Sequence, residues 1–230
     1  MESSTLEPSI ADIIIRSRQT VLDILEDRGY DAMPYRNIAP DQILTLVESS
    51  SRTAVESSFV HALNMTLNKK ADSAGGANAP CDRAAVVYIM QERNLRGRLG
   101  TFTRDVYEGS DLTKADDIMV LVNEPWHDIF DKTSLQMWQQ QKARITFFHL
   151  KQVVVHPGRH VLVPPHRKLN VDEAKAEMTR WSVTSKIQFP IIKHSDIQAK
   201  LLGLVPGDVV EILRPSPTSG IARVLRICAA

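Results

Sequence analysis

The stretch that most constrains the fold of this chain is residues 189–228, where turn-forming residues punctuate short apolar runs. Pro190 forces the residue before it out of the helical region, so the stretch begins extended. Ser195 predicts the N-cap of a short helix with Asp196 near its positive end, and Gly203 predicts a left-handed stop. This order of signals predicts a small domain that mixes helix and strand.

The second half of the same stretch predicts a β-hairpin. Residues 205–208 read V-P-G-D, in which proline presets one central position of a β-turn and Gly207 supplies the positive φ of the next. Residues 209–213 are β-branched or aliphatic and predict a strand, which Pro215 is expected to end. Residues 221–228 predict the returning strand.

Residue types alone fit any small domain built from a helix and a hairpin, although strand alternation puts Arg223 and Arg226 on opposite faces. The spacing of the glycine, proline and capping residues is more specific. It resembles the C-terminal domain of the fifth-largest subunit shared by the eukaryotic nuclear RNA polymerases, a domain that is also found in archaeal RNA polymerase. The residues that match are Leu162, Val163, Pro164, His166, Pro190, Asp196, Ala199, Gly203, Gly207, Val209, Val210, Ile212, Arg214, Pro215, Ser216, Gly220 and Arg226.

The resemblance is strong over residues 162–228 and weaker back to about residue 16, where the D-R-G-Y of residues 27–30 resembles the end of the family's first helix. Residues 38–80 have no match. The chain also departs from the family pattern: V-P replaces a basic pair at 205–206, and W-H-D-I at 126–129 replaces a T-P-S-A-like segment that the family places near downstream DNA. The departure at 205–206, Ile197 in place of the family's proline, and the unmatched residues 38–67 motivate the hypothesis of a divergent paralogue, either lineage-specific or polymerase-specific.

Length and composition are those of an ordinary globular chain. The 230 residues are 43% hydrophobic and 24% charged, enough for one large or two modest domains. The sequence contains no apolar run approaching the roughly 18–20 residues that span a bilayer, and its first residues do not resemble a signal peptide, so we expect an intracellular protein. Two cysteines, Cys81 and Cys228, support neither a disulfide framework nor a cysteine-based zinc site.

Charge is distributed unevenly along the chain. Residues 1–155 carry 17 basic and 21 acidic side chains, a net charge of −4, whereas residues 156–230 carry 11 and 6, a net charge of +5. Because affinity for nucleic acid scales with the number of phosphates neutralised, a chain of overall charge +1 is not expected to bind DNA by itself. Any contact with nucleic acid should be local and assisted.

The remaining elements follow from periodicity and capping signals. Ser9 and Asp12 have capping-box spacing and Gly29 suits a helix stop, so residues 9–29 predict a helix with one apolar face. Asn170 predicts the N-cap of a helix ending near residue 181. We further expect helices at 41–47, 53–67 and 126–144, a surface loop at 71–82, and strands at 84–90, 101–107, 117–122 and 144–155.

Arg93, Arg96, Arg98 and Arg104 form the one concentrated basic patch of the first 155 residues. A solvated loop surface explains such a patch, and contact with an acidic partner or with phosphate is the alternative. In the family context, Arg93, Arg96 and Arg98 become the candidates for a weak contact with downstream DNA.

The sequence provides little support for catalysis. His156, His160 and His166 lie with Asp172 along an extended, proline-containing segment and lack the helical spacing of a metal site. Asp116, Asp117 and Glu124 flank a predicted strand and are interpreted as solvated strand ends. No phosphate-binding glycine loop or G-x-S-x-G motif is present. We therefore expect no catalytic residue, no metal, no cofactor and no small-molecule substrate.

The resemblance implies an α/β N-terminal jaw domain, residues 1–155, with helices packed on a mixed sheet, followed by a small α+β C-terminal assembly domain, residues 156–230. It implies a non-catalytic subunit of a nuclear polymerase that docks on the largest subunit. The alternative is a stand-alone transcription-related interaction module that reuses the same C-terminal domain. The expected interface residues are Pro164, His166, Asp196, Gly203, Gly207, Arg214, Ser216 and Arg226.

Overall fold

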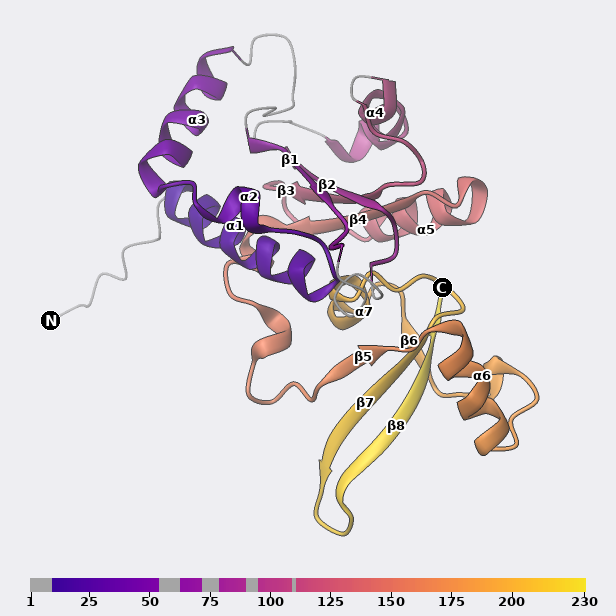
Figure 1. Cartoon of the computed structure of the whole chain (residues 1–230). Helices are drawn as coiled ribbons and strands as arrows, with labels where there is room; N and C mark the ends of the chain where they lie inside the picture. Colours follow the sequence, from indigo (N-terminus) through magenta and orange to yellow (C-terminus); the bar gives the residue numbers. More distant parts are fainter. Residues whose placement is uncertain (1–9, 54–62, 72–78, 90–94, 109–110) are drawn as a thin grey trace, which may run out of the picture.

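The computed structural model describes residues 10–53, 63–71, 79–89, 95–108 and 111–230. Each of its two four-stranded sheets belongs to a separate unit (Figure 1). We call the elements from α1 to η3 the N-terminal unit and those from β5 to β8 the C-terminal unit. Residues 154–165, which include the short η4 helix (Pro157–Arg159), form the linking segment between them.

The N-terminal unit is a mixed sheet of order β1-β2-β3-β4, in which β1 is antiparallel to β2 and the other pairs are parallel. Parallel neighbours need a crossover connection, and here α4 and α5 provide the two crossovers. Its elements are α1 (Ile10–Asp27), α2 (Met33–Arg36), α3 (Pro40–Thr53), β1 (Met65–Asn68), β2 (Arg83–Ile89), α4 (Leu95–Glu108), β3 (Asp117–Val122), α5 (Ile129–Gln141), β4 (Arg144–His149) and η3 (Leu150–Val153).

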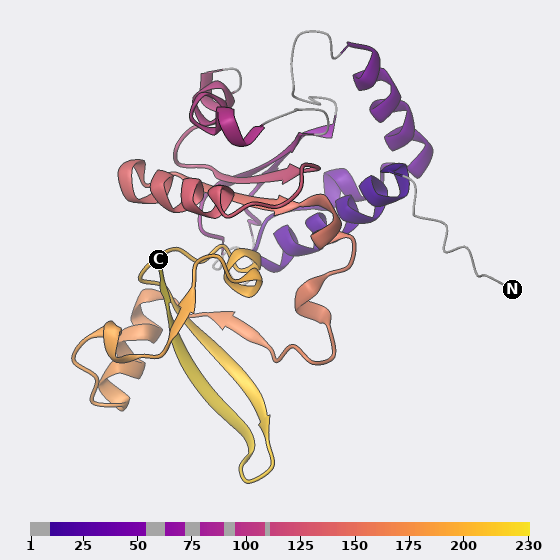
Figure 2. The same ribbon diagram turned by 180° about the vertical axis from the view of Figure 1, so that it is seen from behind.

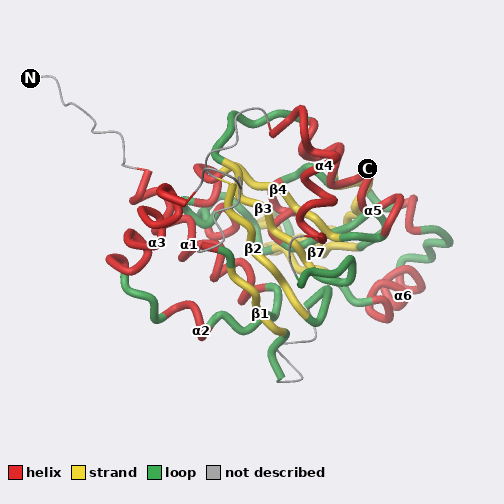
Figure 3. Tube along the Cα trace, turned by 90° about the horizontal axis from the view of Figure 1, so that it is seen from above, coloured by secondary structure: helices red, strands yellow, loops and turns green. Residues whose placement is uncertain are grey.

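Helices cover both faces of this sheet. Alternate strand residues such as Met119 and Leu121 join α1 in one apolar core, while Ile118 and Val120 join α4 and α5 in another. Figure 3 shows α1 and α3 on one side of the strands and α4 and α5 on the other. All six residues of β3 are buried, as expected for a parallel strand that is covered on both faces. The predicted arrangement of helices on a mixed sheet is confirmed.

Two predicted elements of this unit are wrong. Residues 101–107 are β-branched and aromatic enough to predict a strand, but they belong to α4, which buries Leu95, Leu99, Phe102 and Val106 at helical spacing. The helix predicted over residues 53–67 does not reach its predicted end, because β1 alternates buried and exposed residues and pairs with β2. Residues 54–62 of that prediction lie outside the described residues.

The other N-terminal predictions hold with shifted ends. Helix α1 matches the helix predicted over residues 9–29, and Gly29 has a φ of 100°; Ser9 lies outside the described residues. Helix α3 extends beyond the predicted 41–47, and the strand predicted over 144–155 ends at His149, where η3 begins. Of the loop predicted over 71–82, residues 72–78 also lie outside the described residues. No helix in the described part of the chain is long and apolar enough to cross a membrane.

The C-terminal unit is smaller and is built on a sheet of order β5-β7-β8-β6. Its α6 helix packs with one cluster of buried residues and its α7 helix with another. Strands β7 and β8 form a long hairpin whose closed end projects away from the rest of the molecule (Figure 2). Its elements are β5 (His166–Lys168), α6 (Val171–Arg180), η5 (Lys186–Gln188), β6 (Ile191–Lys193), α7 (Ile197–Leu201), β7 (Val209–Ser216) and β8 (Gly220–Ala229).

The signals of residues 189–228 are largely confirmed. Phe189 is extended before Pro190, Gly203 has a φ of 60° after α7, and Gly207 has a φ of 96° in the turn. The predicted N-cap of α7, Ser195, is wrong. Asp196 caps the helix instead, because its Oδ1 accepts a 2.8 Å hydrogen bond from the Gln198 amide. Asp196, one position beyond the predicted cap, is the last residue with extended backbone, which suits an N-cap.

The hairpin differs from the prediction at one residue. Pro215 does not end β7, since it pairs with Ile221 and the strand continues to Ser216. At this point the outer edge of β7 has no neighbouring strand, because β5 pairs only with residues 210–212, so the missing amide proton of proline is tolerated. Arg223 and Arg226 lie on opposite faces of β8, as expected from strand alternation.

Candidate docking site

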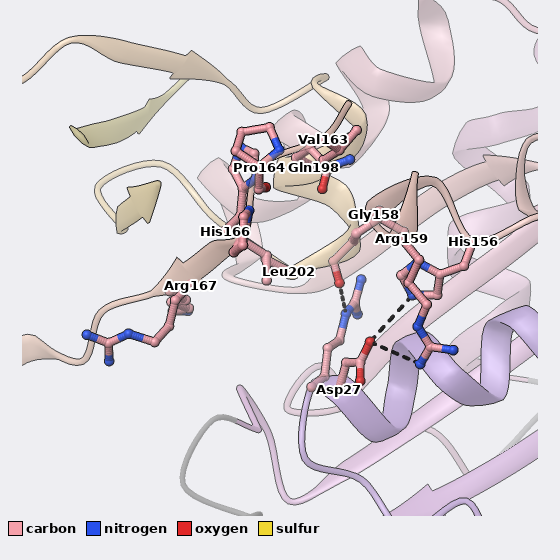
Figure 4. A pocket seen from close by; sticks show the side chains of 14 residues that line it. Asp27, His156, Gly158, Arg159, Val163, Pro164, His166, Arg167, Gln198 and Leu202 are labelled. Atoms are coloured by element: carbon pink, nitrogen blue, oxygen red, sulfur yellow. Dashed lines mark hydrogen bonds and ion pairs between the residues drawn. The ribbon is translucent and has the colours of Figure 1, made fainter. Parts of the chain in front are cut away.

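A cavity of about 350 Å³ lies where the linking segment, the end of α1 and α7 meet. Pro164 and His166 line it, so the structure brings these two predicted interface residues together (Figure 4). His166 begins β5, and its Nδ1 lies 2.6 Å from the carbonyl oxygen of Pro164. This contact orients the imidazole ring beside the cavity.

Ion pairs hold the linking segment against α1 at the rim of the cavity. Arg159 lies 2.6 Å from Asp23 and 3.7 Å from Asp27, and His156 Nε2 lies 3.5 Å from Asp27; the contacts to Asp27 are drawn in Figure 4. Burial and the nearby Arg159 charge lower the pKa of His156, and Asp27 offsets them only in part. His156 is therefore neutral at physiological pH, and the charges that hold this segment come from Arg159 and the two aspartates.

The other predicted interface residues lie at separate places. Asp196, Gly203 and Gly207 surround α7 and the turn that follows it, and Gly203 is buried. Arg214 and Ser216 lie near the closed end of the hairpin. Arg226 lies on the opposite strand beside β6, where its Nη1 donates a 3.3 Å hydrogen bond to Ile191 O. The eight predicted residues thus form no single cluster in the free chain.

The C-terminal part of the chain exposes large apolar side chains on several elements. Val161 and Leu162 in the linking segment are 92% and 83% exposed, Ile187 is 84% exposed, and Trp181 and Ile221 are more than half exposed. Single exposed apolar residues are ordinary, and these residues lie on separate elements, so their exposure offers individual contact points for a partner.

Charged side chains stabilise the α6 face of the C-terminal sheet. Glu211 of β7 accepts hydrogen bonds from Arg167 Nε at 2.9 Å and from Arg223 Nε, and Arg223 Nη1 also donates to Glu177 of α6 at 2.7 Å. Burial raises the pKa of Glu211, but the hydrogen bonds from Arg223 and Arg167 outweigh it and bring the pKa below its ordinary 4.5. Arg223 therefore pairs with two carboxylates on the α6 face of the sheet.

Two of the three candidate DNA-side arginines, Arg96 and Arg98, belong to α4 and not to a loop between strands. Arg96 donates a 2.8 Å hydrogen bond from Nε to Glu124, whereas Arg98 is exposed. Arg93 lies outside the described residues. The structure therefore places two of the three candidates, Arg96 and Arg98, on one helix.

Metal binding and cysteine reactivity have little support among the described residues. They contain no group of three or more His, Cys, Asp and Glu side chains placed to hold a metal ion. Burial raises the pKa of Cys81 to about 11 and that of Cys228 to about 12, so both thiols are protonated and weakly reactive at neutral pH.

The sequence did not predict a set of polar residues where the two units meet. Arg28 and Arg144 of the N-terminal unit donate to carbonyl groups at the end of α7, and Asp117 pairs with Arg28. Lys200 of α7 contacts Asp131. The D-R-G-Y motif was noted for its helix-ending glycine, but nothing local reveals the partners of its arginine. Trp126 was noted as a departure from the family pattern, and the centre of its ring lies 4.2 Å from Lys200 Nζ.

Comparison with known proteins identifies similarities along the chain. Residues 155–228 match the family model described as RNA polymerase Rpb5, C-terminal domain. The DNA-directed RNA polymerase subunit Rpo5 of Pyrococcus abyssi is 46% identical over 69 residues, which are 30% of this chain and 83% of that protein. The DNA-directed RNA polymerases I, II, and III subunit rpabc1 of Dictyostelium discoideum is 25% identical over 217 residues, 94% of this chain and 96% of that protein.

Proposed function

Because the chain belongs to the Rpb5 and Rpo5 family of DNA-directed RNA polymerase subunits, we propose that it is a non-catalytic subunit of a nuclear RNA polymerase. The observation that carries this proposal is the collinear similarity to a eukaryotic relative over 94% of the chain. A relative that reused only the C-terminal domain would match over residues 155–228 alone. Both units are therefore part of the proposed role.

The C-terminal unit, with the linking segment, is the proposed docking domain, residues 156–230, and the largest polymerase subunit is its proposed partner. The exposed apolar side chains of Val161, Leu162 and Ile187 support this assignment. A stable subunit interface buries roughly 1,600 Å² or more in total, with apolar side chains at its centre. The net charge of +5 over residues 156–230 favours an acidic surface on the partner.

The N-terminal unit, within residues 1–155, is the proposed jaw domain near downstream DNA. Its net charge of −4 restricts any contact with DNA to a local one, for which Arg93, Arg96 and Arg98 are the candidates. Phosphodiester synthesis belongs to the other subunits of the complex in this proposal.

Affinity purification of the tagged chain from a nuclear extract tests the proposal, with the largest polymerase subunits as the readout. We expect them to copurify with the parent chain. Leu162→Asp and Ile187→Asp should each reduce the recovery at least tenfold, because a buried unpaired carboxylate in an apolar interface is costly. Recovery of the chain with other proteins but without any largest subunit would favour the stand-alone interaction module instead.

Met33→Asp is the matched control. Met33 is 59% exposed on the N-terminal unit, away from the proposed interface, so the same substitution there should leave recovery unchanged. Equal loss in all three variants would contradict docking through the C-terminal unit. We also propose that the chain is a polymerase-specific paralogue, and recovery of the three largest subunits in equal amounts would contradict that part alone.

A further inference from the structure

Arg28 connects the two units at a buried position directly after α1. Its Nε donates a 2.9 Å hydrogen bond to Leu201 O, and its Nη2 donates to Lys200 O. Its Nη1 lies 2.7 Å from Asp117 Oδ2, and the side chains of this pair are 1% and 2% exposed. One guanidinium group thus joins the first residue of β3 to the last turn of α7.

A second arginine binds the same end of α7. Arg144, the first residue of β4, donates a 3.0 Å hydrogen bond from Nη1 to Gly203 O. The last carbonyl groups of a helix have no partner within the helix and carry partial negative charge. Here two arginines of the N-terminal unit donate to three carbonyl groups, those of Lys200 and Leu201 in the last turn of α7 and that of Gly203 just after it.

Contacts also run in the opposite direction, from α7 into the N-terminal unit. Lys200 Nζ lies 2.5 Å from Asp131 Oδ1 and 4.2 Å from the centre of the Trp126 ring, and its side chain is 6% exposed. Leu201 packs in the apolar core that contains α1. Each unit therefore supplies a cation to the other, and the buried Leu201 adds an apolar contact at the same junction.

These contacts depend on the local backbone at Gly203. Its φ of 60° turns the chain away after α7, and a Cβ atom there would lie 3.3 Å from Arg28 Cζ. A left-handed glycine is common at a helix end, but here the guanidinium group occupies the space beside it. The helix stop and the arginine that binds it are thus fitted to each other.

We propose that Arg28 is a positioning residue that fixes the orientation of the C-terminal unit relative to the N-terminal unit. Neither half of the contact is complete alone. Without α7, the guanidinium group loses two acceptors. Without Arg28, the buried Asp117 loses its cation and the Leu201 carbonyl loses the donor from Arg28, while the Lys200 carbonyl keeps the Gly203 amide. The two units then move as one rigid body. This inference rests on contacts within the chain and is independent of the proposed polymerase role.

Double electron–electron resonance on the free full-length chain tests the proposal. Spin labels attached to cysteines placed at Gln140 and Ser219, both exposed, report the distance between α5 and the closed end of the hairpin. Cys81→Ser removes the accessible native thiol, and Cys228 is 2% exposed. The parent should give one narrow distance distribution, and Arg28→Gln should broaden or shift it while the amide spectra of both units stay dispersed.

Arg83→Gln is the control, because Arg83 pairs with Asp116 within the N-terminal unit, next to Asp117 in sequence. It should leave the distribution as narrow as in the parent. If Arg28→Gln does not fold, Arg28→Lys replaces it, since lysine keeps the charge but cannot donate to both carbonyl groups and to Asp117 in the same geometry. A folded Arg28 variant with the parental distribution would overturn the proposal.

Discussion

The N-terminal and C-terminal units differ in how completely they bury their sheets. In the N-terminal unit helices cover both faces, and every residue of β3 is buried. In the C-terminal unit the inner ends of β7 and β8 are covered by α6 and α7, while residues 213–215 and 217–221 are exposed. Helices of the same chain therefore cover both faces of the first sheet, whereas part of the second sheet stays exposed to solvent.

The relatives of this chain match it over different lengths. One relative matches only the C-terminal part of the chain and is 46% identical over 69 residues. A different relative matches nearly the whole chain and is 25% identical over 217 residues. The 69 matched residues make up 83% of the first relative, so that protein is scarcely longer than the C-terminal part.

The largest expected effect concerns the junction between the two units. Gly203→Val places a β-branched residue at a φ of 60° and brings Cβ to 3.3 Å from the Arg28 guanidinium carbon. Backbone strain of about 1–2 kcal/mol and overpacking of about 1–3 kcal/mol together predict a loss of about 2–5 kcal/mol. Urea unfolding of the full-length chain measures it, and an unchanged midpoint would show that the junction contributes nothing to stability.

Gly100→Ala provides the matched control in the N-terminal unit. Gly100 lies within α4, and a Cβ atom there meets nothing within 4 Å. Alanine is favoured over glycine in a helix interior by about 0.8–1 kcal/mol, so this variant should be slightly more stable than the parent. Destabilisation by both substitutions would mean that glycine replacement harms the chain irrespective of position.

Local signals explain the parts of the fold that the sequence predicted. Strand β3 coincides with the predicted residues 117–122, because an uninterrupted apolar run between polar residues has well-defined ends. The stop after α7 and the following turn depend on Gly203 and Gly207, whose positive φ values few other residues adopt. Asn170 was predicted to cap α6 because asparagine is a favoured N-cap residue, and the structure adds a reciprocal contact with Glu173.

The errors and omissions arise where tertiary contacts decide the outcome. Residues 101–107 have strand-like composition, yet the parallel pairing of β2 and β3 requires a crossover between them, and a helix forms. The contact between Arg28 and Lys200 joins residues 172 positions apart, so no spacing rule could reveal it. The candidate docking residues remain predictions. The free chain places them at separate points, and only a bound partner would show which of them it contacts.

A second, smaller effect tests whether charge compensates for the smaller core of the C-terminal unit. The pKa of Glu211 lies below its ordinary 4.5, so its stabilising effect is complete above that pH and is lost as the pH falls through the lowered pKa. Glu211→Gln should therefore cost about 1–2 kcal/mol at pH 7, because Arg223 and Arg167 are partly exposed. The gap between parent and variant should narrow below pH 4.5.

Thermal unfolding between pH 3 and pH 7, followed through the amide signals of β7 and β8, measures this gap. Asp172→Asn is the control, because the Asp172 side chain is 94% exposed on the first turn of α6. It should leave the stability within about 0.5 kcal/mol of the parent. A Glu211→Gln deficit that is constant over the whole range would assign the loss to packing and not to the charge.

The smallest expected effect concerns the candidate DNA contact of the acidic N-terminal unit. In the assembled polymerase, Arg98→Gln should weaken binding to downstream duplex DNA less than tenfold and reduce the salt dependence by at most about one phosphate contact, a slope change of about 0.9. Arg96→Gln should have an effect of at most the same size, because each arginine can neutralise about one phosphate. Binding measured against salt concentration gives the slope for each variant. If both leave the slope unchanged, neither Arg96 nor Arg98 contacts a phosphate, and the proposed DNA contact through these two residues is wrong.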